Sequence, residues 1–103
     1  GVFYYEGSHK IGLLKHKASF APGSSQTVKN LGKLKNLKII TPKLNPGDCI
    51  IHNAMIVHGS NKNTSKFSRR GITIRYVPKS SKVIKKLKQN YETSLIKQNK
   101  KYI

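Results

Sequence analysis

The sequence predicts a mostly β domain followed by a basic helix, and three observations lead to this fold class. Residues 71–77 alternate between large apolar side chains and small or polar ones, which is the two-residue period of a strand. Before Pro78, short β-branched and aromatic runs are separated by Gly and Pro. After Pro78, apolar residues recur at spacings of three and four, which is typical of one face of a helix.

The N-terminal elements follow from local composition. Residues 2–6 are aromatic and β-branched and lead into a Gly-Ser pair, which predicts a strand that enters a turn. Residues 10–35 mix small residues, a Pro-Gly pair and lysines, and we expect a long surface loop with room for one short element. Residues 37–41 predict a further strand, and the prolines at 42 and 46 break the chain after it.

Three later runs predict the best-ordered part of the chain. Residues 49–52 and 54–58 are short apolar runs, so we expect two strands there, with Cys49 as a small core residue. Residues 71–77 predict a third strand, whose large apolar face would line a core. Residues 81–98 predict a basic amphipathic helix that docks on its own domain or on an acidic surface. Its apolar positions are Val83, Ile84, Leu87, Tyr91, Leu95 and Ile96.

Length, charge and cysteine content restrict the function. The chain has 103 residues, a net charge of +18 and one cysteine. One cysteine excludes an internal disulfide framework and a multi-cysteine zinc site, and no apolar run is long enough to span a membrane. Lysine dominates the 21 basic residues and accompanies a bias toward Asn and Ile, which indicates background coding composition rather than a nucleic-acid site.

The segment from Gly47 to Gly71 contains the residues with the clearest chemical potential. His58 ends an apolar run just before Gly59-Ser60, and Arg69 follows eleven residues later. A neutral imidazole together with an arginine fork that grips a carboxylate suits iron and a chelating keto acid. The same spacing also fits a histidine that caps a turn and an arginine in a surface ion pair. The three carboxylates are too few and too scattered to predict a paired-carboxylate active site.

This segment resembles the C-terminal half of the phytanoyl-CoA dioxygenase family of iron(II)/2-oxoglutarate oxygenases. That family has a Gly-Asp turn, an apolar strand, a His-Gly-Ser motif, an Asn five residues after the His and an Arg eleven residues after it. The chain matches these features, in order, at Gly47-Asp48, residues 49–51, His58-Gly59-Ser60, Asn63 and Arg69. An upstream family motif is matched by Gly7-Ser8-His9-Lys10, Gly12-Leu13 and His16.

The resemblance implies a role for several residues. His58 would be the distal histidine of the 2-His-1-carboxylate iron triad, and no catalytic residue is implied beyond this metal site. Arg69 would bind the distal carboxylate of 2-oxoglutarate, and Ser60 would donate a hydrogen bond to the same carboxylate. Asn63 is interpreted as a residue that orders the loop. The remaining assignments are Arg70 as a neighbour on the opposite face, His52 as a packing residue in its strand, His9 as a turn residue and His16 as a surface residue.

The chain departs from the family pattern in two places, a loop and the iron site. Glu6 stands where the family has Pro before Gly-Ser-His, which implies a local change in the loop. More important, no histidine in the chain is followed two residues later by Asp, so the family's His-x-Asp motif is missing. With one of three iron ligands, the chain is expected to be the C-terminal part of a longer enzyme and inactive alone. Residues 1–78 would form half of a double-stranded β-helix, or jelly-roll, and residues 79–103 a basic helix or tail.

The resemblance further implies Fe(2+) and 2-oxoglutarate as cofactors, O2 as a co-substrate and a small-molecule substrate. Coenzyme-A esters, free small metabolites and natural-product intermediates all fit as substrates, and the lysines of residues 10–35 would favour an anionic one. No membrane or nucleic-acid partner is expected. The absence of a targeting signal predicts a cytoplasmic protein.

Two alternatives to this function remain open. One is a small non-catalytic basic protein that binds nucleic acid or an acidic partner through residues 79–103. The other is an inactive oxygenase-like remnant.

Overall fold

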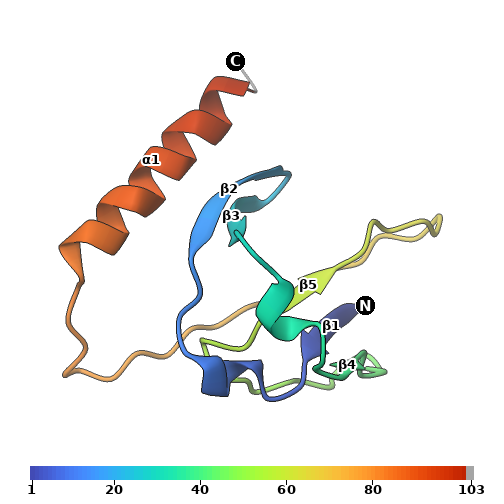
Figure 1. Cartoon of the computed structure of the whole chain (residues 1–103). Coiled ribbons are helices and arrows are strands. Elements are labelled where there is room, and N and C mark those ends of the chain that lie inside the picture. The colour runs from blue at the N-terminus through green and yellow to red at the C-terminus, as the bar shows by residue number, and fades with distance from the viewer. Residues whose placement is uncertain (102–103) are drawn as a thin grey trace. The chain divides into compact units, whose positions relative to one another are not determined.

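Strand β1 (Val2–Tyr5) is the centre of a three-stranded antiparallel sheet in the computed structural model, which describes residues 1–101 (Figure 1). Strands β4 (Ile39–Ile40) and β5 (His58–Ser60) flank β1 on its two edges. The predicted strand at residues 2–6 is therefore confirmed, and the one predicted at residues 37–41 is present in shorter form. Aromatic and β-branched side chains suit a central strand because they pack well on a pleated surface.

The chain forms two units that interleave along the sequence. The first unit contains residues Gly1–Lys15 and Asn30–Lys66, and the second contains His16–Lys29 and the chain from Phe67 onward. The first unit holds the three-stranded sheet and the short helix η1 (Ser8–Ile11), together with η2 (Gly32–Leu34). The predicted boundary near Pro78, between residues 1–78 and 79–103, stays a prediction.

The second unit contains a hairpin where the sequence predicted a surface loop. Strands β2 (His16–Ala21) and β3 (Ser24–Val28) pair antiparallel, and Pro22-Gly23 forms the turn between them. Both strands consist largely of small and polar residues, so they lack the apolar alternation that normally indicates a strand. The turn and the backbone pairing define this hairpin, and the prediction for residues 10–35 was wrong in this part.

Helix α1 (Lys85–Lys101) packs on the hairpin and confirms the predicted C-terminal helix, shifted a few residues toward the C-terminus. Its contacts with the hairpin include polar ones: Gln26 Nε2 donates to Ser94 Oγ at 3.0 Å, and Gln98 Nε2 donates to the Ala21 carbonyl at 3.1 Å. Ser94 and Gln98 are buried, whereas the predicted apolar positions Leu87, Tyr91, Leu95 and Ile96 are more exposed. Hydrogen bonds to the hairpin therefore contribute to docking, with less apolar burial than the sequence predicted.

Three predicted strands are not formed in the structure. Residues 49–52, residues 54–57 and residues 71–77 lie outside every described strand, and His58 begins β5 instead of ending a run. Ile72 is 94% exposed and Tyr76 is 89% exposed, and Cys49 is also exposed rather than in the core. An alternating pattern gives a stable strand only where neighbouring strands satisfy its backbone and cover its apolar face. Residues 71–77 have no such neighbour in the part of the chain that is described.

The architecture is thus two small antiparallel sheets and one C-terminal helix, without a closed β-helix among residues 1–101. The predicted fold class is confirmed in part, because five short strands precede α1. The predicted jelly-roll is not formed among the described residues. A separate finding is that no helix within the described chain combines the length and the apolar character needed to cross a bilayer.

Leu34 is the one large apolar side chain in residues 1–101 that is fully buried, at 1% exposure. Replacement of Leu34 by Ala should lower the free energy of unfolding by about 2–5 kcal/mol, because it removes buried methyl groups and leaves a cavity. Urea denaturation followed by circular dichroism measures this change. The matched control is Leu44→Ala, because Leu44 is 53% exposed and its truncation should cost little. Equal effects of the two substitutions would contradict the assignment of Leu34 to the core.

Candidate functional site

His58 is the first residue of β5 and lies opposite Tyr4 on the central strand β1. Its Nδ1 atom is 3.0 Å from the main-chain carbonyl oxygen of Ile56. A carbonyl oxygen can only accept, so Nδ1 carries the hydrogen and donates it. The hydrogen bond therefore leaves the lone pair of the neutral imidazole on Nε2, which is the arrangement found in metal-binding histidines. The residue as a whole is exposed.

A second histidine and a tyrosine lie against His58. The His52 and His58 ring centroids are 5.1 Å apart, and Tyr4 is 5.4 Å from His52 and 5.8 Å from His58. His52 Nδ1 is 3.1 Å from the carbonyl oxygen of Asn53, so it also donates to the main chain. The sequence predicted that His52 packs within a strand. The structure instead places it on an exposed loop, in contact with the other two rings.

The upstream Gly-Ser-His motif holds the segment that carries His58. Ser8 is fully buried, and its hydroxyl oxygen accepts a hydrogen bond of 2.8 Å from the Val57 amide. The Tyr5 amide donates to the Val57 carbonyl at 2.9 Å, so both main-chain groups of Val57 are bonded. Gly7 has a φ of 75°, a left-handed conformation that favours glycine and turns the chain into η1. Sequence reasoning missed this role of Ser8.

Gly59 is required by the close approach of a ring from β1. It pairs with Phe3, and a Cβ atom placed on Gly59 would lie 2.9 Å from Phe3 Cζ. Real Cβ atoms do not approach this closely, so a larger residue would displace the ring. The glycine of the His-Gly-Ser motif therefore leaves room for the Phe3 ring of β1 to lie against the β5 backbone.

The two predicted cofactor-binding residues lie in different parts of the chain. Ser60 is the last residue of β5, and two-residue spacing puts it on the same face of that strand as His58. Arg69 belongs to the second unit, in a segment without regular secondary structure. The structure therefore does not bring Arg69 and His58 together within one unit, and the binding roles of Ser60 and Arg69 stay predictions.

Asn63 orders its loop in the way the sequence predicted. Its Oδ1 accepts from the Ser65 amide at 3.1 Å and from the Ser65 hydroxyl at 2.8 Å. This pattern, in which an asparagine side chain bonds two residues ahead, is that of an Asx-turn. Asn63 thus stabilises the chain that follows the His-Gly-Ser motif.

The carboxylates do not complete a metal site around His58. Asp48 Oδ2 accepts from the Asn45 amide at 2.8 Å within a local turn, and Glu92 lies 3.8 Å from Lys88 on α1. In the described residues, no group of three His, Cys, Asp or Glu side chains comes close enough to hold a metal ion. The role of His58 as a ligand of an iron triad stays a prediction, and in residues 1–101 no carboxylate lies beside it to complete such a site.

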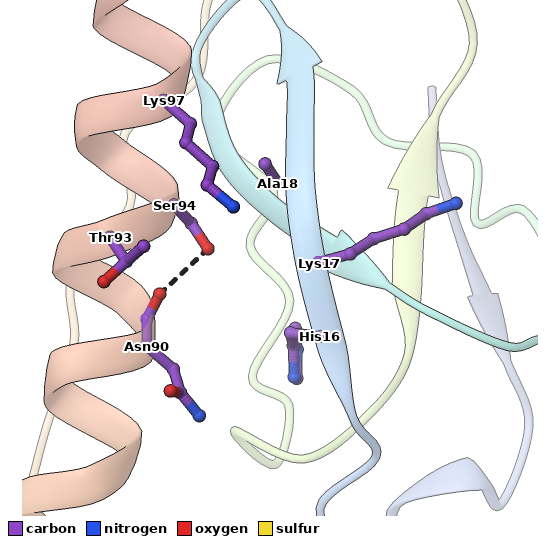
Figure 2. A pocket seen from close by; sticks show the side chains of 7 residues that line it. All are labelled: His16, Lys17, Ala18, Asn90, Thr93, Ser94 and Lys97. Atoms are coloured by element: carbon purple, nitrogen blue, oxygen red, sulfur yellow. Dashed lines mark hydrogen bonds between the residues drawn. The ribbon is translucent and has the colours of Figure 1, made fainter.

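The second unit contains a polar hollow of about 280 Å³ between α1 and the hairpin. Figure 2 shows the Lys97 side chain extending from α1 toward the hairpin, whereas Lys17 points away from the helix. The lining residues are His16, Lys17, Ala18, Asn90, Thr93, Ser94 and Lys97. Ser94 Oγ is already engaged, because it donates to the Asn90 carbonyl at 2.9 Å. None of the predicted site residues lines this hollow, and it lacks a carboxylate or thiol that could act with His16.

A family model described as phytanoyl-CoA dioxygenase matches residues 1–71 of the 103-residue chain. This match covers β1, the Gly-Ser-His turn, the His-Gly-Ser strand and Arg69. Neither the curated proteins nor the solved structures include one that matches the chain. The matched segment is therefore the part of the molecule in which Ser8 positions the strand of His58.

Replacement of Ser8 by Ala should destabilise the first unit by about 1–3 kcal/mol, because the partly buried Val57 amide would lose its acceptor. Hydrogen exchange of the Val57 amide should accelerate, and urea denaturation should report the loss of stability. The control is Ser80→Ala, since Ser80 is exposed. Unchanged protection of the Val57 amide in Ser8→Ala would refute the proposed anchoring.

Replacement of Gly59 by Ala should cost about 1–3 kcal/mol, since the new methyl group would overlap the Phe3 ring. Nuclear Overhauser contacts between β1 and β5 should weaken in the same variant. Gly71→Ala is the matched control, because a Cβ atom at Gly71 would meet nothing within 4 Å. Wild-type contacts and stability in Gly59→Ala would show that β5 has room for a side chain.

Proposed function

The chain belongs to the phytanoyl-CoA dioxygenase family, and from this premise we propose that it is the C-terminal portion of an iron(II)/2-oxoglutarate-dependent hydroxylase. The observation that supports the proposal best is the state of His58. Its motif lies inside the matched residues, the residue is exposed, and its Nδ1 is bonded to the main chain, which leaves the lone pair of the neutral ring on Nε2.

The residues present fit one position of an iron site and leave the others to be filled. His58 supplies a neutral imidazole nitrogen, which suits iron(II). The triad also requires a His-x-Asp pair, and residues 1–103 contain none. We therefore propose that catalysis needs such a segment in addition to this chain, and that residues 1–103 alone are inactive. Iron(II) and 2-oxoglutarate, when bound, supply the activation of O2 that hydroxylates an aliphatic carbon with release of succinate and carbon dioxide.

Ser60 and Arg69 are the residues proposed to bind 2-oxoglutarate. Ser60 lies on the His58 face of β5, so its hydroxyl is on the side where the metal would be held. Arg69 carries a planar guanidinium that can bind a carboxylate through two parallel hydrogen bonds, and it follows the loop ordered by Asn63. In this proposal His58 holds the metal, while Ser60 and Arg69 orient the keto acid beside it.

The proposed substrate is a small molecule, with anionic compounds and coenzyme-A esters as the classes that the charge favours. Residues 1–78 contain 13 basic and 2 acidic residues, so the segment that carries the site is strongly positive. A positive field raises the local concentration of anionic substrates and speeds their association.

The coding sequence upstream of Gly1 provides the first test. An in-frame His-x-Asp that follows a strand-like run is expected, and a stop codon directly upstream would contradict the proposal for this chain.

In the protein that contains the His-x-Asp segment, Arg69→Ala should raise the KM for 2-oxoglutarate by about 10- to 100-fold, because a charge-assisted hydrogen bond is lost. Arg70→Ala is the matched control and should leave the KM near the wild-type value. Steady-state kinetics with varied 2-oxoglutarate measure both variants. If Arg69→Ala kept the wild-type KM, Arg69 would not be the residue that binds the keto acid.

A further inference from the structure

The hollow between α1 and the hairpin presents hydrogen-bond donors that the second unit does not use. Its lining includes Lys97, Asn90 and His16, and Figure 2 shows the Lys97 and Asn90 side chains leaving α1 on the side of the hairpin. Among residues 1–101, no hydrogen bond or ion pair engages the Lys97 ammonium, the Asn90 side-chain amide or the His16 ring. All three groups can donate hydrogen bonds. The hollow therefore offers several donors to a ligand.

The charge of the second unit leaves Lys97 without an acidic partner. This unit contains 13 lysines and arginines but one acidic side chain, Glu92. Glu92 lies 3.8 Å from Lys88, one turn away on the same helix. A hollow lined by charge of one sign concentrates the electrostatic field, so it attracts ions of the opposite sign. The expected ligand of the hollow is thus an anion.

The residue types in the hollow favour a phosphate-type oxyanion over a carboxylate ligand. A carboxylate is bound best by the two parallel hydrogen bonds of an arginine fork, and no arginine is among the described residues that line the hollow. Lysine is a compact point charge, which binds phosphate well without a fixed fork geometry. The volume of about 280 Å³ is at the lower limit of small-molecule pockets, which hold roughly 300–1,000 Å³. The hollow therefore has room for a phosphate group but not for a large cofactor.

Two hydrogen bonds hold the walls of the hollow together. The bond from Gln26 Nε2 to Ser94 Oγ, at 3.0 Å, joins α1 to β3. The bond from Gln98 Nε2 to the Ala21 carbonyl, at 3.1 Å, joins α1 to β2. Ser94 and Gln98 are buried, so both contacts lie in a region of low dielectric where hydrogen bonds are stronger. Walls that are in place before a ligand arrives reduce the conformational freedom that is lost on binding.

We propose that this hollow binds a small oxyanion of the phosphate type, with Lys97 as the charged contact and with Asn90 and His16 as further donors. The inference goes beyond the proposed function, because it uses none of the residues proposed to bind iron or 2-oxoglutarate. Free phosphate and the phosphate headgroup of a lipid share this chemistry, and the two arms of the experiment separate these sources.

Titration of the untagged 103-residue chain with inorganic phosphate, followed by ¹H–¹⁵N spectra in a chloride buffer, is the first arm. We expect saturable shifts of the Asn90 side-chain amide and of the main-chain amides around Lys97. Lys97→Gln should weaken phosphate binding by about 10-fold or more, because a charge-assisted hydrogen bond is lost. Lys97→Arg keeps the positive charge and should retain most of the affinity. Lys100→Gln is the matched control, since it removes the same charge from an exposed position of α1 outside the hollow.

Vesicles of phosphatidylcholine with and without phosphatidic acid form the second arm, with sedimentation as the measurement. A response to inorganic phosphate that depends on Lys97 assigns the hollow to free phosphate. Binding that depends on Lys97 and occurs with phosphatidic acid alone assigns it to a lipid headgroup.

Two results would overturn the proposal. One is the absence of Lys97-dependent binding in both arms. The other is an equal loss of binding in Lys97→Gln and Lys100→Gln, which would show general attraction to a basic helix and no defined site. Amide spectra of Lys97→Gln verify that the second unit keeps its fold, as expected for an exposed residue.

Discussion

The site depends on the hydrogen bond that the Val57 amide donates to the buried hydroxyl of Ser8. This bond is 2.8 Å long and joins residues 49 positions apart in the sequence. It ties the turn after β1 to the residue before His58, and the β1–β5 pairing then sets His58 opposite Tyr4. A partly buried amide without an acceptor and a buried hydroxyl without a partner both cost free energy, so this geometry is favoured. This hydrogen bond and the strand pairing together place His58 against Tyr4.

The parts of the fold that sequence could predict are those with a strong local signal. The aromatic run at residues 2–5 and the helical spacing after Pro78 were sufficient to predict β1 and α1. The hairpin of β2 and β3 was missed because its small and polar residues form strands through the Pro22-Gly23 turn, not through apolar alternation. Residues 71–77 show the opposite case. Their alternation is clear, but a strand also requires neighbours, and the described chain provides none for it.

The candidate site shows the same division between local pattern and tertiary contact. The motif spacing identified His58, Ser60 and Arg69 as residues of interest, and the Asx-turn of Asn63 followed from its residue type. Motif spacing could not reveal that Ser8 anchors Val57 or that the Tyr4 ring contacts His58. Those contacts join segments that are far apart in the sequence. A small hydroxyl residue inside a glycine-containing turn is a weak signal for such a contact. The contact between Gly59 and Phe3 also could not be predicted from the sequence, because it depends on the register between β1 and β5.

We infer that the fold fixes the tautomer of His58 and leaves Nε2 unprotonated, the state that the proposed metal ligand requires. Long-range ¹H–¹⁵N correlation spectra of the metal-free chain, recorded at a pH where the imidazole is neutral, measure this state directly. The hydrogen bond to the Ile56 carbonyl predicts a protonated Nδ1 and an unprotonated Nε2 on His58. A spectrum in which Nε2 carries the hydrogen and Nδ1 does not would contradict the claim.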